Sequence, residues 1–458
     1  MRAWLARPVD PLSLVVFRFA FGFVLLFGAV RFVANGWVES QLIAPDFHFT
    51  YPFFSWVRPL PDHVLYGVFA AQIACAALIA AGWHYRFACV CFFVAFTYVE
   101  LIDQATYLNH YYFVSLVALL LALLPLHRWG SIDARRSREK AEPFAPRWVP
   151  FALQLQIAVV YFFAGLAKLN PDWLFRAQPL RVWLSARSGF PLLGPLFDQE
   201  WTAFAMSRGG AVFDLAVPFL LFHRRSRPLA YLGVIGFHFM TGALFPIGIF
   251  PWVMIAATLV FFDGDDLRGL GRVVGRVAGR VGRTPSSPRA PTSLPSPASR
   301  SLAGLGLPGR SLRFALVGFL AIQIVLPLRH LAYPGPVLWT EEGFRFSWRV
   351  MLAEKTGTLY YSVTDPSTGR SWEAFPGAPL TPLQTKQMAF QPDMILAYAH
   401  HLRDRLAAEG VADPQIRAFA HVSLNGRPSE LLVDPEVDLA RVERSLSPRR
   451  WVLHHPDL

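Results

Sequence analysis

The stretch FALQLQIAVVYFFAGLAKLN (residues 151–170) is apolar for about five helical turns and then presents Lys168. A run of this length and composition is typical of a helix that crosses a membrane. A protonated lysine beside hydrocarbon is costly, so Lys168 is expected to reach the interface, to pair with an anion, or to give up its proton. Only the third outcome supplies a base near neutral pH, and a desolvated lysine can reach it whereas an arginine cannot.

The same apolar pattern recurs along a chain of 458 residues that is 54% hydrophobic. About twenty such residues are needed to cross roughly 30 Å of hydrocarbon. Candidate spans cover residues 12–30, 63–82, 87–107, 108–126, 151–167, 209–222, 229–245, 247–262 and 312–331. The sequence therefore predicts a polytopic α-helical membrane domain of about eight to nine transmembrane helices, followed by an extramembrane, mostly β (α+β) C-terminal domain.

The net charge of +12 lies in alternate loops and not on one face of a soluble domain. Basic residues are concentrated at Arg2 and Arg7, at Arg86, and in segments 128–147, 224–227 and 268–313. This distribution indicates topology and gives no support to nucleic-acid binding. If all these segments are cytoplasmic, the N-terminus is inside, the chain crosses nine times, and the Lys168 end of the fifth span and the C-terminal domain are outside. The arginine-rich composition and the Pro/Ser/Arg linker indicate a bacterial source, so the outside face is expected to be periplasmic and the membrane the inner (cell) membrane.

The few cysteines and the first span limit other interpretations. Cys75, Cys89 and Cys91 all fall within predicted spans, so no disulfide framework or thiolate metal site is expected. The first apolar stretch contains Arg18 and continues without a small-residue cleavage site, which favours a retained helix over a cleaved signal peptide.

Composition divides the chain into four parts. Residues 1–263 form the predicted helical membrane domain with the catalytic pocket, and 264–311 a disordered linker rich in Gly, Arg, Pro and Ser. Residues 312–332 form the last span, and 333–458 the external β-rich domain. Within the linker, Arg268, Arg272, Arg276 and Arg280 recur every fourth residue, so a short helix with a basic face toward lipid headgroups is the alternative to a solvated linker.

The C-terminal region carries strand signals at 344–353, 358–365, 419–424 and 430–434. Asn425-Gly426 is typical of a hairpin turn between the last two strands. A helix is predicted over 393–409, ending at Gly410, with His400 and His401 on its surface.

Polar groups interrupt the predicted spans, where such residues usually face the bundle interior. They are Arg18, Glu100, Asp103, Asn109, His110, Asp214 and His238. In the derived orientation several lie near the outer leaflet, as Lys168 does, so a shared pocket is geometrically feasible. Each also has a structural interpretation: Asp214 pairs with an arginine, His238 is a satisfied core histidine, and Asn109 joins helices.

Several motifs, in order along nearly the whole chain, resemble the vitamin K-dependent gamma-glutamyl carboxylase family, with an HTTM-like membrane domain. The strongest are VVYFFAGLAKLNPDWL (159–174), GGAVFDLAVPFLLF (209–222) and FHFMTGALFPIGIFPWVM (237–254). RPLPDHVLYGVF near Arg58, TYLNHYYF around His110, FSWRVML and LLVDPEVDLARV are also similar.

The resemblance implies a membrane enzyme of the lyase class that oxidises vitamin K hydroquinone, or menaquinol, with O2 to the epoxide. The strong base so formed would deprotonate a glutamate of a peptide or protein for addition of CO2. By this matching Lys168 is the catalytic base and His110 a second catalytic residue. Asn109, His238, Asp172 and Trp173 are candidates for substrate binding. A dry pocket suits such chemistry.

The chain departs from animal members of the family in three ways. Ala167 stands where they carry a first lysine before the base, and the cysteines that link their two domains have no counterpart. The chain is also shorter, so docking of a propeptide is not assumed. A quinol epoxidase with another acceptor, or with no carboxylation, is the alternative enzyme. A transporter or scaffold is the non-enzymatic one, although no internal repeat is apparent. No metal site is expected, because the histidines lack ligand spacing.

Overall fold

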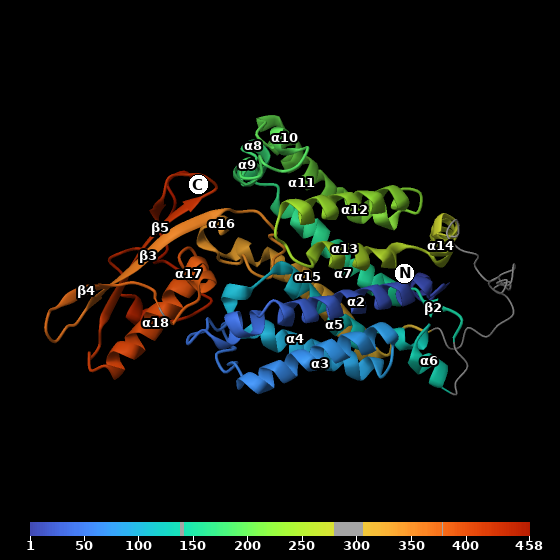
Figure 1. Cartoon of the computed structure of the whole chain (residues 1–458), viewed down its shortest axis with the longest axis horizontal. Helices are drawn as coiled ribbons and strands as arrows, with labels where there is room; N and C mark the ends of the chain where they lie inside the picture. Colours follow the sequence, from blue (N-terminus) through green and yellow to red (C-terminus); the bar gives the residue numbers. More distant parts are fainter. Residues whose placement is uncertain (138–141, 279–305, 378) are drawn as a thin grey trace.

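The computed structural model describes residues 1–137, 142–278, 306–377 and 379–458. Figure 1 shows a bundle of long helices at one end of the molecule and a smaller part with strands and helices at the other. Each part has its own apolar core. The predicted class, a helical membrane domain followed by a β-containing C-terminal domain, is confirmed.

Every predicted span corresponds to a helix in the described part of the chain. Six helices are long and apolar enough to cross a membrane: α2 (Leu12–Ala34), α3 (Asp62–Ala81), α4 (Tyr85–Ile102), α7 (Trp148–Ala167), α11 (Glu200–Phe222) and α15 (Arg310–Leu328). Three others complete the bundle: α5 (Asn109–Leu123), α12 (Arg227–Leu244) and α13 (Phe250–Thr258). The chain is therefore a membrane protein.

Two predicted boundaries differ most from the structure. The span expected over 87–107 ends at Ile102, because the Asp103 side chain accepts a hydrogen bond from Ala105 N at 2.7 Å and caps a short 3-10 helix, η2 (Gln104–Thr106). The span expected over 209–222 begins earlier, at Glu200.

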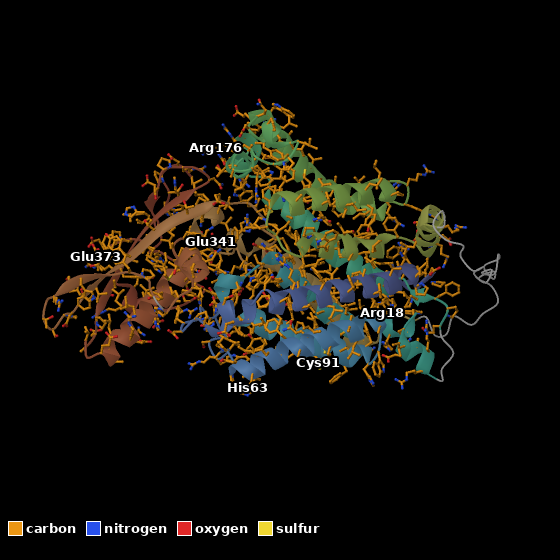
Figure 2. All side chains as sticks on the ribbon, in the orientation of Figure 1. Arg18, His63, Cys91, Arg176, Glu341 and Glu373 are labelled. Carbon is orange, nitrogen blue, oxygen red and sulfur yellow. The ribbon has the colours of Figure 1, made fainter. Side chains whose placement is uncertain are left out.

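The helices α6 (Ile132–Arg136) and α14 (Gly264–Ala278), which overlap basic segments of the sequence, lie at the end of the bundle where the N-terminus lies (Figure 1). Arg18 is buried on α2, and its guanidinium donates to the carbonyls of Leu126, Trp129 and Gly130 at 2.6–2.9 Å. Figure 2 shows Arg18 toward this end and His63, at the start of α3, toward the opposite end. Arg18 therefore binds the segment after α5 to α2 and supplies hydrogen-bond donors to carbonyl groups that would otherwise lack them.

The predicted linker 264–311 begins with a helix, α14 (Gly264–Ala278), that carries Asp265 and Asp266 in its first turn. Acidic residues in the first turn stabilise a helix N-terminus, so helical structure continues past residue 264, where the linker was predicted to begin. Arg268 forms ion pairs with Asp10 and Asp265. The remainder of the predicted linker, from 279 to 305 and with Arg280, lies outside the described residues.

The C-terminal part contains a four-stranded antiparallel sheet in the order β4-β3-β5-β6. The strands are β3 (Lys355–Thr364), β4 (Ser371–Ala374), β5 (Gln415–Leu424) and β6 (Glu430–Leu431). Helices α17 (Pro382–Met388) and α18 (Pro392–Ala408) accompany the sheet. The strands predicted at 358–365, 419–424 and 430–434 and the helix before Gly410 are confirmed, whereas β4 and α17 were not predicted.

The strand predicted over 344–353 is wrong. Phe346, Trp348 and Met351 have positive φ angles of 61°, 58° and 54°, which no regular strand has. The Trp348 side chain is buried against the helical bundle and not in the sheet: it stacks on Tyr112 of α5 with ring centroids 5.0 Å apart. The apolar residues of this segment therefore serve a contact between the two parts of the chain. A local sequence pattern does not reveal such a contact.

Candidate active site

The charged centre of the site is an ion pair between α7 and α11. Lys168 follows the last residue of α7, and its Nζ donates to Asp214 Oδ2 at 2.5 Å. Both side chains are buried, at 7% and 5% exposure. Of the outcomes open to this lysine, the structure shows pairing with an anion. The expectation of an arginine beside Asp214 is corrected, because the partner of Asp214 is Lys168.

Gly165 allows the two helices to approach closely enough for this pair. A Cβ at Gly165 would lie 2.8 Å from the backbone nitrogen of Leu215, the residue after Asp214. The Leu215 backbone cannot move aside as the end of a flexible side chain could, so a residue with a Cβ does not fit at position 165. The small residue one turn before Lys168 therefore sets the separation of α7 and α11.

Gly165→Ala should destabilise the protein by about 1–3 kcal/mol and lower turnover, because the added methyl group pushes Asp214 away from Lys168. Thermal unfolding and steady-state rates of the purified variant measure both effects. Gly209→Ala is the matched control, since a Cβ at Gly209 on α11 meets nothing within 4 Å. Equal behaviour of the two variants would contradict the assigned role of Gly165.

Lys168 and Asp214 line a hollow between the helices. Most of the lining is apolar or aromatic and comes from α7, α8 (Pro171–Phe175), α9 (Leu180–Ser185), α11, α12, α13 and the segment before β3. It includes Trp173, Trp183, Met206, Phe237, Met240, Phe245, Phe250, Met254 and Met351. Lys168 Nζ lies 5.3 Å from the centroid of the Trp173 ring. The Lys168–Asp214 pair therefore lies at the wall of a mainly apolar cavity. Such a combination is typical of ligand pockets.

Tyr161 and His238 form a second polar pair in the wall. The tyrosine hydroxyl and His238 Nε2 are 2.8 Å apart, and both side chains are buried. His238 Nδ1 has no hydrogen-bond partner among the residues that the structure describes. A buried polar atom without a partner is rare in proteins, so this nitrogen is available to a bound molecule.

His110 and Asn109 lie beside the hollow and do not line it. The His110 ring packs 5.5 Å from Phe250, whose other neighbour is His238 at 5.6 Å, so one phenyl ring separates the two histidines. Asn109 Nδ2 donates to the Arg349 carbonyl at 3.2 Å, and its side chain lines a neighbouring polar hollow that shares Met351 with the first. The predicted residues are thus in one region but not all in contact with one cavity.

Asp172 and Trp173, adjacent in α8 (Pro171–Phe175), have different surroundings. Trp173 lines the hollow, and its indole donates to Ser207 O at 2.6 Å. The Asp172 carboxylate accepts two hydrogen bonds from Arg427, at 2.5 and 2.7 Å, and one from Asn425 at 2.8 Å. Asp172 therefore holds the C-terminal part against the loop that follows Lys168 and does not face the cavity.

Sequence reasoning missed Tyr161, Trp183 and Met351. Tyr161 lies seven residues before Lys168, two turns along the same face of α7, so helical spacing could have indicated it. Met351 comes from the C-terminal domain, and no signal in the sequence connects it with the spans. Within the described ranges, no group of three or more His, Cys, Asp or Glu side chains could hold a metal ion.

Comparison with known families separates the two halves of the chain. The model of the HTTM domain matches residues 6–265, more than half of the chain. The model of the lumenal domain of vitamin K-dependent gamma-carboxylase matches residues 309–457. No solved structure matches the chain.

Proposed function

Because the chain belongs to the vitamin K-dependent gamma-glutamyl carboxylase family, we propose that it is a membrane enzyme that oxidises a quinol and carboxylates glutamate. The observation that carries the proposal is Lys168, a buried lysine with one carboxylate partner, facing an apolar cavity at the end of a span. A lysine with only a structural role would not need an open cavity beside it.

The residues of the hollow fit a quinol such as vitamin K hydroquinone or menaquinol. Its flat ring and prenyl tail suit the aromatic and methionine side chains, and its hydroxyl groups suit Lys168 and the unpartnered Nδ1 of His238. When bound with O2, the quinol supplies the oxidative energy and the strong base that the protein itself lacks. Trp173 and Phe250 keep water from the reacting region.

Lys168 moves the first proton in this proposal. As the free amine it accepts a hydroxyl proton at Nζ, and the ammonium that forms is paired at once with Asp214. The pair ends without net charge, which is the favourable outcome in an apolar cavity. Asp214 therefore acts on the product side of the transfer, as a counter-charge and an orienting group. Asn109 is proposed to act at the neighbouring hollow, toward the acceptor, and His110 beside Phe250 at the wall of the first hollow.

The proposed acceptor is a glutamate of a peptide or protein, which receives CO2 in a lyase reaction. The adjoining polar hollow contains Arg349 and Lys386 and meets the apolar one at Met351. The N-terminus and the basic loops are proposed to be cytoplasmic and the C-terminal domain external, which is the periplasm if the membrane is a bacterial inner membrane.

Purified protein in detergent tests both halves of the proposal. With a hydroquinone, O2 and labelled CO2, epoxide is expected by chromatography, and label is expected in an added glutamate peptide by mass spectrometry. Epoxide without label would replace the carboxylase by a quinol epoxidase with another acceptor. Neither product, from folded protein, would overturn the proposed reaction.

Tyr161→Phe should lower turnover about tenfold, because His238 loses the hydroxyl group that fixes its tautomer and ring orientation. The substitution removes one oxygen and leaves the ring packing, so the folded state should persist. The ratio of kcat to KM, measured over several quinol concentrations, reports the effect. Tyr231→Phe on α12 is the control, since Tyr231 contacts Ile255 O away from the hollow. An unchanged rate in Tyr161→Phe would remove His238 from the site.

A further inference from the structure

A second polar crevice lies between α2, α3, α4 and α5, apart from the Lys168 hollow. Its walls include Trp37, Phe96 and Tyr111. Two oppositely charged residues line it: Arg31 in the last turn of α2 and Glu100 in the last turn of α4. Both turns are at the end of the bundle that faces the C-terminal part, where a bilayer would have its headgroups.

Neither side chain has a partner of opposite charge in the part of the chain that the structure describes. Across the described ranges, Arg31 and Glu100 form no ion pair within 4 Å with each other or with another residue, and neither side chain forms a hydrogen bond. The Arg31 guanidinium lies over the Trp37 ring, 4.6 Å from its centroid, and so is held in place by an aromatic face. An unpaired guanidinium beside hydrocarbon is costly, so Arg31 favours an outside anion, and a cation bound beside Glu100 would stabilise its carboxylate form.

We propose that this crevice binds the headgroup of an aminophospholipid, with phosphate at Arg31 and the primary ammonium at Glu100. A guanidinium matches phosphate geometry with paired hydrogen bonds, and a carboxylate accepts from an ammonium. A headgroup with both charges satisfies both residues, whereas a phosphate without the amine leaves Glu100 unpaired and near a second negative charge.

The surface of α2 offers a path for the acyl chains. Phe27 and Phe23 precede Arg31 by one and two helical turns, and their side chains are 52% and 57% exposed. Residues four apart share one face of a helix, so a row of exposed phenyl rings runs from Arg31 along the outer surface of α2 toward the middle of that helix. This continuity favours a membrane lipid over a free phosphate compound as the occupant.

Lipid binding to the delipidated full chain in detergent tests the proposal, with short-chain phosphatidylethanolamine and phosphatidylglycerol as probes. The wild type should bind phosphatidylethanolamine about tenfold more tightly than phosphatidylglycerol, because only the former offers Glu100 a charge-assisted contact. Glu100→Gln should remove this preference, and Arg31→Gln should lower the affinity for both lipids. Arg58→Gln, at an exposed position outside the crevice, should change neither.

Two results would overturn the proposal: equal affinity of the wild type for both lipids, or a preference that survives Glu100→Gln in folded protein. Arg31→Gln leaves Glu100 in place and gives an independent reading if Glu100→Gln fails to fold. Glycerophosphoethanolamine, which has no acyl chains, should compete poorly. Competition equal to that of the lipid would assign the crevice to a soluble headgroup compound and contradict the membrane source.

Discussion

Replacing Lys168 with alanine is expected to abolish quinol oxidation by the purified protein, with a loss of roughly 10²- to 10⁴-fold for removal of a general base. Lys168 Nζ is the basic atom that both lines the apolar hollow and contacts Asp214. Epoxide formation under single-turnover conditions measures the loss directly. Retained epoxide formation in the variant would refute the assignment of Lys168 as the base.

The folded state needs its own control, because alanine at 168 leaves the Asp214 carboxylate buried without a counter-charge. Breaking a buried pair in this way costs about 3–5 kcal/mol, whereas replacing both partners by apolar residues of similar size is often close to neutral. The double variant Lys168→Met with Asp214→Leu should therefore melt near the wild type and still be inactive. Wild-type activity in this double variant would exclude the pair from catalysis.

Lys168→Arg separates charge from basicity. Arginine preserves a cation beside Asp214 and so preserves much of the pair, but it cannot give up its proton near neutral pH. The variant should therefore be folded and inactive. Arg58→Lys, at an exposed position outside both hollows, is the conservative control and should turn over normally. Turnover by Lys168→Arg would show that the site needs a positive charge and not a base.

The helical domain was predictable because each span depends on its own composition. About twenty apolar residues must form a helix in a bilayer whatever their neighbours are, so the positions of the spans followed from the sequence. The segment around Trp348 shows the limit of this reasoning. Its apolar residues look like a strand, yet they are buried against α5, and only the docking of two domains explains their pattern.

The site was predictable in part for a similar reason. The cost of a charge at the end of α7 indicated Lys168 without a structure, and the resemblance added His110 and His238. The sequence did not indicate that Asp214 is the partner, because pairing depends on the close approach of α7 and α11 at Gly165. Nor did it show that Asp172 faces the C-terminal domain, since its partners Arg427 and Asn425 are more than two hundred residues away.

Asp172→Ala is expected to lower the free energy of docking between the two parts by about 3–5 kcal/mol, because the buried Arg427 loses both hydrogen bonds to a carboxylate. The predicted turn at Asn425-Gly426 is the element that docks: Arg427 N bonds to Leu424 O, and Gly426 approaches Gln178 and Val182. Thermal unfolding and protease cleavage between the two parts measure the loss. Arg176→Ala is the control, since Arg176 is half-exposed and 3.7 Å from Asp172, and should change stability little.

The contribution of Asp172 should also depend on pH in one direction. Burial acts to raise the pKa of Asp172, but the hydrogen bonds from Arg427 and Asn425 and the charge of Arg427 outweigh it, so the pKa is lowered. A carboxyl group with a lowered pKa stabilises the folded state fully above its unfolded value of about 3.9 and loses that effect as the pH falls through the folded pKa. The stability difference between wild type and Asp172→Asn should therefore be constant near neutrality and shrink in acid. A difference that grows as the pH falls would contradict the ion pair with Arg427.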